Sequence, residues 1–261
     1  MSVLVDEFDL FMDKINQYAN IDLRKYKRPQ MQRRLTALRD KLGFKNFGEY
    51  FDAMKADPKL FHQFLDRMTI NVSEFYRNAN RWEVVEKRIF PEFLKTSKRL
   101  KIWSAACSTG EEPYTIAMIL SQFLPLSEIK IIASDIDENA IAKAKQGVYH
   151  QRSLQFIPEA MVKKYFTKID NQTYAISDEI KKCITFRKQN LLEDKFDSDY
   201  DLIVCRNVII YFTEEAKDQL YHKFSNALRP GGILFVGSTE QIFNPAAYRF
   251  NTYDTFFYQH Q

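Results

Sequence analysis

The stretch Ile102-Trp103-Ser104-Ala105-Ala106-Cys107-Ser108-Thr109-Gly110-Glu111-Glu112-Pro113-Tyr114 decides the fold of this chain. It has the pattern of an apolar strand, a turn of small residues and the first turn of a helix. The next apolar segment ends at Ser134-Asp135-Ile136-Asp137, so an acidic group falls 25 positions after Gly110. A strand-turn-helix-strand unit presents a carboxylate to a ribose at about this spacing. The arrangement therefore predicts a nucleoside-binding site.

The turn lacks the glycines that a pyrophosphate requires. Neither G-x-G-x-x-G nor G-x-x-x-x-G-K-[ST] is present among the seven glycines of the chain. Glu111 and Glu112 would repel a phosphate, but they suit the cationic amino and sulfonium end of S-adenosylmethionine. We therefore interpret the turn as a site for a methyl donor. An alternative is that Thr109-x-x-Glu112 is only a capping box, which satisfies backbone N–H groups at the start of a helix.

Composition and charge limit the class of protein. With 261 residues, of which 45% are hydrophobic, the chain can bury a large core. No stretch approaches the ~20 apolar residues of a membrane span, and the acidic start does not resemble a signal peptide. The three cysteines form no C-x-x-C pair, and the four histidines lack metal-ligand spacing. We expect a cytoplasmic protein with no metal site and no direct membrane insertion.

Positive charge is concentrated near the N-terminus. Residues 22–45 contain nine basic and two acidic residues, an excess of seven positive charges, whereas the whole chain carries only +4. Apolar residues at three- and four-residue steps predict a helix here, with charges on both flanks of its apolar stripe. Such charges either face solvent or attract an acidic partner.

The pattern of elements changes along the chain. Residues 1–70 predict a helical domain, and residues 71–98 a linker and a helix. Residues 99–261 alternate strands and helices, which predicts an α/β fold with a doubly wound, mainly parallel sheet. Within it, residues 148–184 predict an inserted β-subdomain with a hairpin over residues 165–176, and residues 255–258 an aromatic edge strand. The expected sheet strands are 100–105, 129–133, 184–188, 201–205 and 233–236.

Three further motifs complete the pattern: Asn71-Val72-Ser73-Glu74-Phe75-Tyr76-Arg77-Asn78, Cys205-Arg206-Asn207-Val208-Ile209-Ile210-Tyr211-Phe212, and the run from Leu228 to Glu240. With residues 104–114 and 133–137, they closely resemble the CheR family of chemotaxis receptor glutamate O-methyltransferases. The resemblance covers essentially the whole chain. It implies a class I S-adenosylmethionine-dependent methyltransferase fold, and methyl transfer from S-adenosylmethionine, with S-adenosylhomocysteine as product, to glutamates on cytoplasmic receptor helices.

The resemblance also implies roles for single residues. Arg77 should lie beside the sulfonium, Asp135 should bind the ribose, and Tyr211 should face the reacting centre, so that Arg77 and Tyr211 are the catalytic candidates. Each candidate also has an ordinary structural alternative, such as core packing for Tyr211, an ion pair for Arg77 or Arg206, and turn capping for Asn190. The expected cofactor contacts are Asn71, Ser73, Arg77, Ala105, Glu112, Asp135, Asn190, Leu191, Arg206 and Asn207.

The expected partners follow from the same resemblance. The basic segment should bind acidic receptor helices through Arg33, Arg34, Arg39 and Lys41. The compact hairpin tip at residues 168–172 has no glycine, which predicts a member that does not need a C-terminal receptor tether. We expect a monomer, recruited to receptor arrays, that does not bind nucleic acid. The rival interpretations are a nucleic-acid methyltransferase and a non-catalytic protein that binds the donor.

Overall fold

The computed structural model describes residues 6–261, and the chain divides into two compact units. The first unit contains the chain up to Ile70 together with Asn190–Lys195 and Val208–Tyr221. The second contains Asn71–Gln189, Phe196–Asn207 and His222–Gln261. Two short segments from the C-terminal half of the chain thus belong to the same unit as the N-terminal helices.

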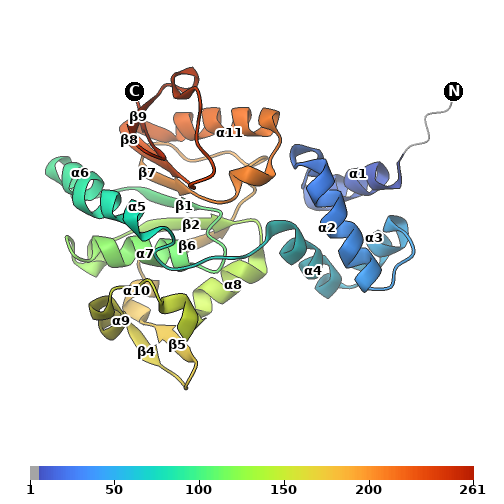
Figure 1. Ribbon diagram of the computed structural model, residues 1–261, viewed down its shortest axis with the longest axis horizontal. Helices are drawn as coiled ribbons and strands as arrows, with labels where there is room; N and C mark the ends of the chain where they lie inside the picture. Colours follow the sequence, from blue (N-terminus) through green and yellow to red (C-terminus); the bar gives the residue numbers. More distant parts are fainter. Residues whose placement is uncertain (1–5) are drawn as a thin grey trace. The chain divides into compact units, whose positions relative to one another are not determined.

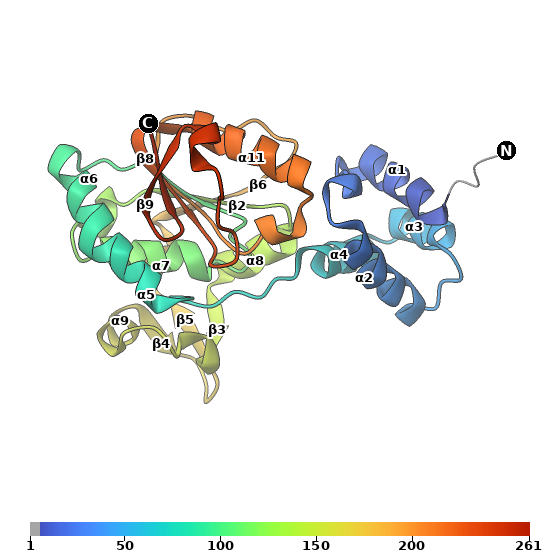
Figure 2. The same ribbon diagram turned by 45° about the horizontal axis from the view of Figure 1, so that its top comes forward.

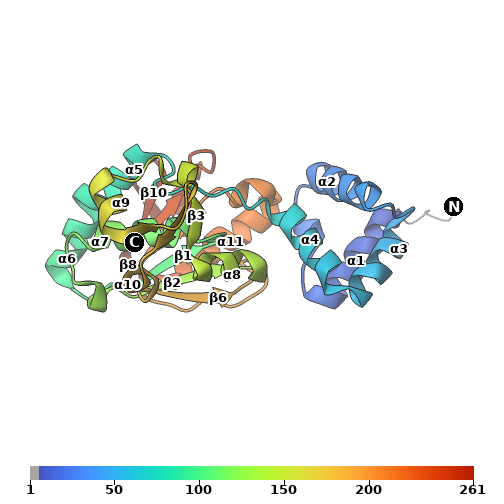
Figure 3. The ribbon, with the colours of Figure 1, turned by 90° about the horizontal axis from the view of Figure 1, so that it is seen from below.

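The first unit is built on four helices, drawn in colours from dark blue to teal in Figures 1 and 3. These are α1 (Glu7–Ala19), α2 (Arg28–Lys41), α3 (Phe47–Ala56) and α4 (Pro58–Thr69), with a 3₁₀ turn, η1 (Leu23–Lys25), before α2. Aromatic side chains fill the core: the rings of Phe11 and Phe47 lie 4.7 Å apart, and both are buried. Polar side chains cap the N-termini of the helices. Asp6 accepts from the Phe8 N–H at the start of α1, and Asn46 accepts from the Glu49 N–H at the start of α3.

The segment Val208–Tyr221 is bonded to the N-terminal part of this unit through its backbone. Tyr26 and Phe212 form an antiparallel bridge, the Lys27 N–H donates to the Tyr211 carbonyl (2.9 Å), and the Thr213 N–H donates to the Lys25 carbonyl (2.9 Å). The 3₁₀ turn η5 (Ile209–Tyr211) is therefore fixed against the chain between η1 and α2. Helix α11 (Glu214–Ala227) follows it.

A seven-stranded sheet forms the centre of the second unit (Figures 1 and 2), with strand order β6-β2-β1-β7-β8-β10-β9. Strands β6, β2, β1, β7 and β8 are parallel, and β10 and β9 are antiparallel to their neighbours. This confirms the predicted α/β, doubly wound and mainly parallel sheet. The bounds are β1 Ile102–Ala105, β2 Ile131–Asp135, β6 Ile184–Lys188, β7 Tyr200–Cys205, β8 Leu228–Val236, β9 Phe250–Asp254 and β10 Phe257–His260.

Helices complete the core around the sheet. Helix α7 (Glu111–Leu120) contacts β1, β2 and β6, and α8 (Glu138–Gln146) contacts β2 and β6. Helix α5 (Ala79–Val84) continues through a π-helical turn, Val85–Ile89, into α6 (Phe90–Thr96). The buried Trp82 and Phe90 of this segment join one apolar cluster with Ile116 of α7 and Phe235 of β8.

The C-terminal strand does not occupy the predicted position at the edge of the sheet. Strand β10 is aromatic and antiparallel, but it is not the edge, because β9 pairs with its other side. The edge prediction was wrong because Phe250-Asn251-Thr252-Tyr253-Asp254 lacks an apolar pattern. A polar, half-exposed strand of this kind is what a sheet edge tolerates.

The inserted segment forms a small antiparallel sheet of order β3-β5-β4. The hairpin of β4 (Phe166–Lys168) and β5 (Thr173–Ile176) was predicted, whereas β3 (Val148–His150) was not. Asp170 caps the hairpin turn by accepting from the N–H groups of Gln172 (2.7 Å) and Thr173 (2.9 Å). Short helical turns complete the subdomain: η4 (Gln151–Leu154), α9 (Glu159–Tyr165) and α10 (Asp178–Lys181).

Two further features concern residues 6–261. None of the helices in this range has the length and apolar character needed to cross a membrane. Cys107, Cys183 and Cys205 are buried free thiols.

Candidate active site

The backbone of the turn after β1 enters the left-handed region at three residues. Ala106, Ser108 and Gly110 have φ angles of 60°, 47° and 94°. A Cβ on Gly110 would stand 2.8 Å from the Ala144 side chain, so glycine is required for the close approach of α8. Gly110 is also the N-cap residue of α7, and it has no side chain with which to cap the helix.

The acidic residues of this turn do not form the capping box that was the alternative interpretation. Thr109 Oγ1 donates to the Glu111 carboxylate (2.6 Å), and Ser104 Oγ donates to Glu112 Oε1 (2.8 Å). The structure contradicts the capping alternative, because Gly110 and not Thr109 is the N-cap residue of α7, so the helix begins one residue later than the box requires. Glu112 is instead held beside β1 through its hydrogen bond with Ser104.

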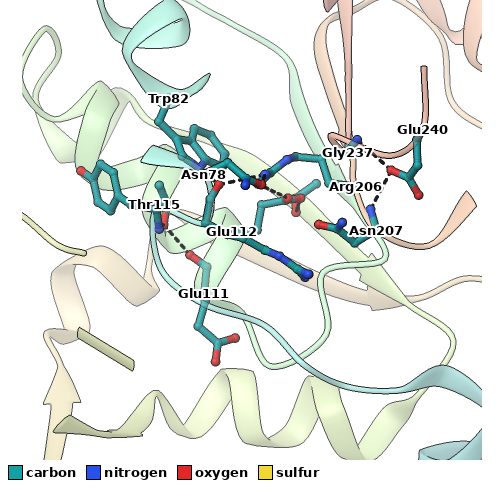
Figure 4. Close-up of polar contacts among 12 residues, drawn as sticks. Asn78, Trp82, Glu111, Glu112, Thr115, Arg206, Asn207, Gly237 and Glu240 are labelled. Atoms are coloured by element: carbon teal, nitrogen blue, oxygen red, sulfur yellow. Dashed lines mark hydrogen bonds and ion pairs between the residues drawn. The ribbon is translucent and has the colours of Figure 1, made fainter. Parts of the chain in front are cut away.

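Glu112 and Arg206 form a buried ion pair (Figure 4). The Arg206 Nη1 atom lies 3.7 Å from Glu112 Oε2, and the two side chains are only 3% and 13% exposed. Burial raises the pKa of Glu112 to about 7, although the positive charge of Arg206 opposes this rise. The carboxylate therefore titrates near neutral pH.

Arg206 is held on several sides. Its Nη2 atom donates to the Arg77 carbonyl (2.8 Å) and to Asn78 Oδ1 (2.8 Å), and its guanidinium stacks over Trp82 and Phe235. Burial lowers the pKa of Arg206 from its ordinary value. Its Nε atom is buried, and none of the residues from 6 to 261 provides a partner for it. A bound ligand with an acceptor group would satisfy this donor.

Asp135 ends β2 as a buried carboxylate. Its Oδ2 atom accepts from the Ser108 N–H (2.8 Å) and its Oδ1 atom from the Asp137 N–H (3.0 Å). Burial raises its pKa to about 6, and these hydrogen bonds limit the rise. Asn71 adjoins the same turn, because its Nδ2 donates to Asp137 (2.7 Å) and its Oδ1 accepts from Ser108 (3.1 Å).

Glu240 is a residue of this site that the sequence did not reveal. Its Oε2 atom accepts from the N–H of Gly237 (2.7 Å) and from the N–H of Asn207 (2.7 Å), and the side chain is 4% exposed. Asn207 has a φ of 61°, so this contact fixes a strained turn after β7. Glu240 thereby joins the segments that follow β7 and β8 (Figure 4). Its position at the end of a resembling motif was the only signal.

The second unit brings together most of the predicted cofactor contacts. The Arg77 Nη1 atom donates to the Val72 carbonyl (3.3 Å). The carboxyl ends of parallel strands lie at one edge of a sheet, so the ends of β1, β2 and β7 carry these groups side by side. The members within this unit are Asn71, Ser73, Arg77, Ala105, Glu112, Asp135, Arg206 and Asn207.

The remaining predicted residues belong to the first unit. Asn190 holds a turn, since its Oδ1 accepts from the Leu192 N–H (3.0 Å) and its Nδ2 donates to the Asn20 carbonyl (2.8 Å). Leu191 is buried. Tyr211 is half-buried, and the guanidinium of Arg34 lies over its ring at 5.0 Å.

The basic residues of α2 differ in whether a nearby acidic side chain already forms an ion pair with them. Arg39 is 15% exposed, stacks over Phe47 and pairs with Asp40 (2.7 Å). Arg33 and Lys41 are exposed and form no ion pair with any described residue. The free positive charge of this helix therefore rests on Arg33 and Lys41, with Arg34 engaged on an aromatic ring.

Two family profiles match the chain. The profile described as "CheR methyltransferase, all-alpha domain" matches residues 6–69, and "CheR methyltransferase, SAM binding domain" matches residues 71–257. The chain belongs to the CheR methyltransferase family. It is therefore an S-adenosylmethionine-dependent methyltransferase, with S-adenosylhomocysteine as the product of the donor.

Relatives of this CheR-family chain are similar over nearly their whole length. The "Chemotaxis protein methyltransferase" of Listeria innocua serovar 6a is 41% identical over 256 residues, 98% of this chain and 97% of the relative. The protein of the same name from Listeria monocytogenes serovar 1/2a is also 41% identical, with the same coverage. Among solved structures, a TehB-like SAM-dependent methyltransferase from Corynebacterium glutamicum has a TM-score of 0.40 and 14% identity, covering 70% of this chain and 93% of that one.

The side chains of the CheR site fit this donor chemically. The methionine end of S-adenosylmethionine carries a cationic amino group, a sulfonium and a carboxylate. Glu112 would offer an anion to the cations, and the buried Arg206 Nε, which has no partner among the described residues, would offer a donor to the carboxylate. The Asp135 oxygens accept from the N–H groups of Ser108 and Asp137, and a carboxylate has about four acceptor sites, so a ribose hydroxyl could also donate to it.

Proposed function

We propose that this enzyme transfers the methyl group of S-adenosylmethionine to glutamate side chains on the cytoplasmic helices of chemoreceptors. The names of the relatives, chemotaxis protein methyltransferases, support a chemotaxis protein as substrate. The observation that carries the proposal for the site is the buried Glu112–Arg206 pair beside the Asp135 strand end. The pair offers a positive and a negative charge to the amino-acid end of the donor, and Asp135 offers a carboxylate to its ribose.

The residues of the site position the reactants, and they need not move a proton. When bound, S-adenosylmethionine supplies a methyl group on a sulfonium. A glutamate carboxylate is ionised at neutral pH, so its oxygen forms the new bond to the methyl carbon as the sulfur–carbon bond breaks, without a general base. A cation and an anion become a neutral thioether and a neutral ester. Arg77 and Tyr211 orient the groups, Asn71 and Ser73 support the donor, and Asn190 and Leu191 border its adenine.

The substrate surface is the basic flank of α2. Arg33 and Lys41 are exposed and unmatched among the described residues, and they attract the acidic methylation helices of the receptor. Arg34 contributes through its contact with Tyr211, whereas the charge of Arg39 is partly matched by Asp40. Because these contacts are exposed, salt weakens them over a Debye length of about 8 Å.

The proposed domain organisation and cellular role follow the sequence patterns. We assign residues 1–70 to the helical domain, of which residues 1–5 lie outside the described part of the chain, residues 71–98 to the linker and its helix, and residues 99–261 to the methyltransferase domain with the β-subdomain at 148–184. The short turn capped by Asp170 supports a member that does not require a receptor tether. The protein acts as a cytoplasmic monomer recruited to receptor arrays, without nucleic acid.

The test is incubation with methyl-labelled donor and receptor-bearing membranes. Label should enter receptor protein and be released by mild base, as expected for a glutamate methyl ester. Label in RNA or DNA would favour a nucleic-acid methyltransferase, and base-stable label would indicate N-methylation. Calorimetric donor binding without transfer to any receptor would favour the non-catalytic alternative.

A further inference from the structure

Phe243 is an exposed aromatic residue in the segment between β8 and the 3₁₀ turn η6 (Pro245–Tyr248). Its side chain is 93% exposed, the highest value among the large apolar residues that are exposed in residues 6–261. Single apolar side chains on a surface are ordinary, so exposure alone does not indicate a contact site. What distinguishes Phe243 is how firmly its neighbours are held.

Hydrogen bonds hold the chain on both sides of Phe243, a buried one before it and an exposed one after it. The Ile242 N–H donates to the Tyr258 hydroxyl (2.8 Å), and Ile242 itself is 5% exposed. On the other side, the Asn244 carbonyl accepts from the Ala247 N–H (3.2 Å). The backbone therefore presents the ring to solvent from an anchored position, which reduces the entropy lost when a partner covers it.

The anchored segment lies at the edge of the sheet that carries the donor site. Glu240, three residues before Phe243, accepts from the N–H of Asn207 (2.7 Å) and of Gly237 (2.7 Å). These residues directly follow β7 and β8, and their contact is drawn in Figure 4. Phe243 is thus tied to the same turn as Arg206, the residue that pairs with Glu112.

A second exposed apolar residue adjoins the site near the end of β2. Val72 is 65% exposed and directly follows Asn71, whose Nδ2 donates to Asp137 (2.7 Å), and the Val72 carbonyl accepts from Arg77 Nη1 (3.3 Å). Val72 is therefore anchored near the Asp135 end of the row of strands, and Phe243 near the β8 end. The two residues flank the predicted donor contacts.

We propose that Phe243, with Val72 as a second contact, docks the receptor helix that presents the reactive glutamate. This inference rests on the proposed function. The glutamate oxygen has to reach a methyl group held at this edge of the sheet, so the helix that carries it must lie over the edge. Helical neighbours three and four positions from the glutamate share its face, and apolar side chains there would cover Phe243. The basic flank of α2 then speeds encounter, while the apolar contacts slow dissociation.

The experiment compares Phe243→Ser with Phe123→Ser. Phe123 is 40% exposed and follows the C-terminal end of α7, at the opposite edge of the sheet. Phe243→Ser should raise the KM for a receptor cytoplasmic fragment about tenfold, as loss of an aromatic anchor does, with kcat, donor affinity and melting temperature unchanged. Phe123→Ser should leave the KM unchanged. Phe243→Leu, which keeps a large apolar side chain, should have a KM close to the wild-type value. Direct binding of the fragment is measured alongside turnover.

The outcomes separate the inference from the proposed function. If the wild-type enzyme forms base-labile label but Phe243→Ser leaves both KM and fragment binding unchanged, the docking role is overturned and the proposed function stands. If the fragment binds without being methylated, and Phe243→Ser weakens that binding, the docking role stands and the proposed function fails. A wild-type enzyme that neither binds nor methylates the fragment overturns both.

Discussion

The Arg206 guanidinium lies 3.7 Å from the Glu112 carboxylate, and both side chains are almost completely buried. A buried ion pair of this kind is not a simple source of stability, because each charge loses its hydration. Here the arginine also bonds to the Arg77 carbonyl and to Asn78, so it links the segment before α5 to the end of β7. The pair therefore sets the geometry of the site as well as its charge.

Removing one partner should destabilise the fold. Arg206→Ala leaves Glu112 buried without its cation and should lower the free energy of unfolding by about 3 kcal/mol, measured by urea denaturation at pH 8. Arg99→Ala, at an exposed position, should change it by less than about 0.5 kcal/mol. A loss for Arg206→Ala as small as that of Arg99→Ala would show that the pair is not coupled to folding.

Donor affinity should depend on pH through Glu112. Its pKa of about 7 means that the side chain is mostly neutral at pH 6 and ionised at pH 8. The cationic donor favours the ionised form, so affinity should rise over this interval, and binding should release a proton. Calorimetry in buffers of different ionisation enthalpy measures both effects. In Glu112→Gln, proton release should disappear and affinity should be lower at pH 8.

The contribution of Glu112 to the stability of the protein should fall as pH rises, whereas donor affinity should rise. The folded-state pKa of Glu112 is raised from 4.5 to about 7, so the folded protein binds a proton more tightly than the unfolded chain. The contribution of this group to the free energy of unfolding is therefore full at low pH and is lost as pH rises to about 7. Glu112→Gln should remove this dependence. An unchanged pH profile in the variant would assign the titration to another group.

Glu240 should act as a positioning residue. Glu240→Ala leaves the N–H groups of Gly237 and Asn207 without their acceptor, which costs about 1–3 kcal/mol for each buried group. The strained Asn207 turn should loosen, so the donor dissociation constant should rise about tenfold. Glu240→Gln keeps an oxygen at this position and should recover more than half of both losses. Glu128→Ala, exposed, is the matched control; equal donor affinity in Glu240→Ala and the wild type would contradict the role.

The parallel sheet could be predicted because its strands are short apolar runs with crossover helices between them. Strand β6 and helix α8 have the predicted bounds, Ile184–Lys188 and Glu138–Gln146. The Asp135 strand end was found by its spacing from Gly110. Strand β9 was missed because it is mostly polar, and β3 because its three residues are too few for a periodic pattern.

Other parts of the site depend on tertiary contacts that leave no local pattern. Glu240 is an acceptor for two backbone groups from different loops, which its neighbours in sequence do not indicate. The segments Asn190–Lys195 and Val208–Tyr221 belong to the unit of the N-terminal helices because of backbone bonds such as Thr213 to Lys25. The periodicity of α2 predicted its charged flanks, but not that Arg39 is matched by Asp40.

The basic residues of α2 should therefore not contribute equally. Arg33→Glu with Lys41→Glu should raise the receptor KM about tenfold and flatten its dependence on salt, because unmatched surface charges act through encounter. Arg39→Ala should change KM less and stability more, since it loses the contacts with Asp40 and Phe47. Donor affinity should remain constant in both variants. KM values that stay at the wild-type level at low salt would show that this flank is only solvated surface.

The hydroxyl of Tyr211 should matter for turnover more than for folding. The ring is held by Arg34, whose guanidinium lies 5.0 Å from its centroid, and the backbone of Tyr211 accepts from the Lys27 N–H. Tyr211→Phe keeps the ring and both contacts, so the melting temperature should not change. Loss of one orienting group should lower the single-turnover rate about tenfold to a hundredfold, and Arg77→Ala should have an effect of similar size.

The control for the hydroxyl is Tyr18→Phe, at a ring that is 46% exposed in the same unit. It should turn over at the wild-type rate. Arg34→Ala provides a second test, because it frees the Tyr211 ring without altering the hydroxyl. If the hydroxyl acts by orientation, Arg34→Ala should lower the single-turnover rate in the wild-type background but have little effect in Tyr211→Phe, since both changes remove the same alignment. Additive losses in the double variant would instead mean that Arg34 acts on the receptor alone.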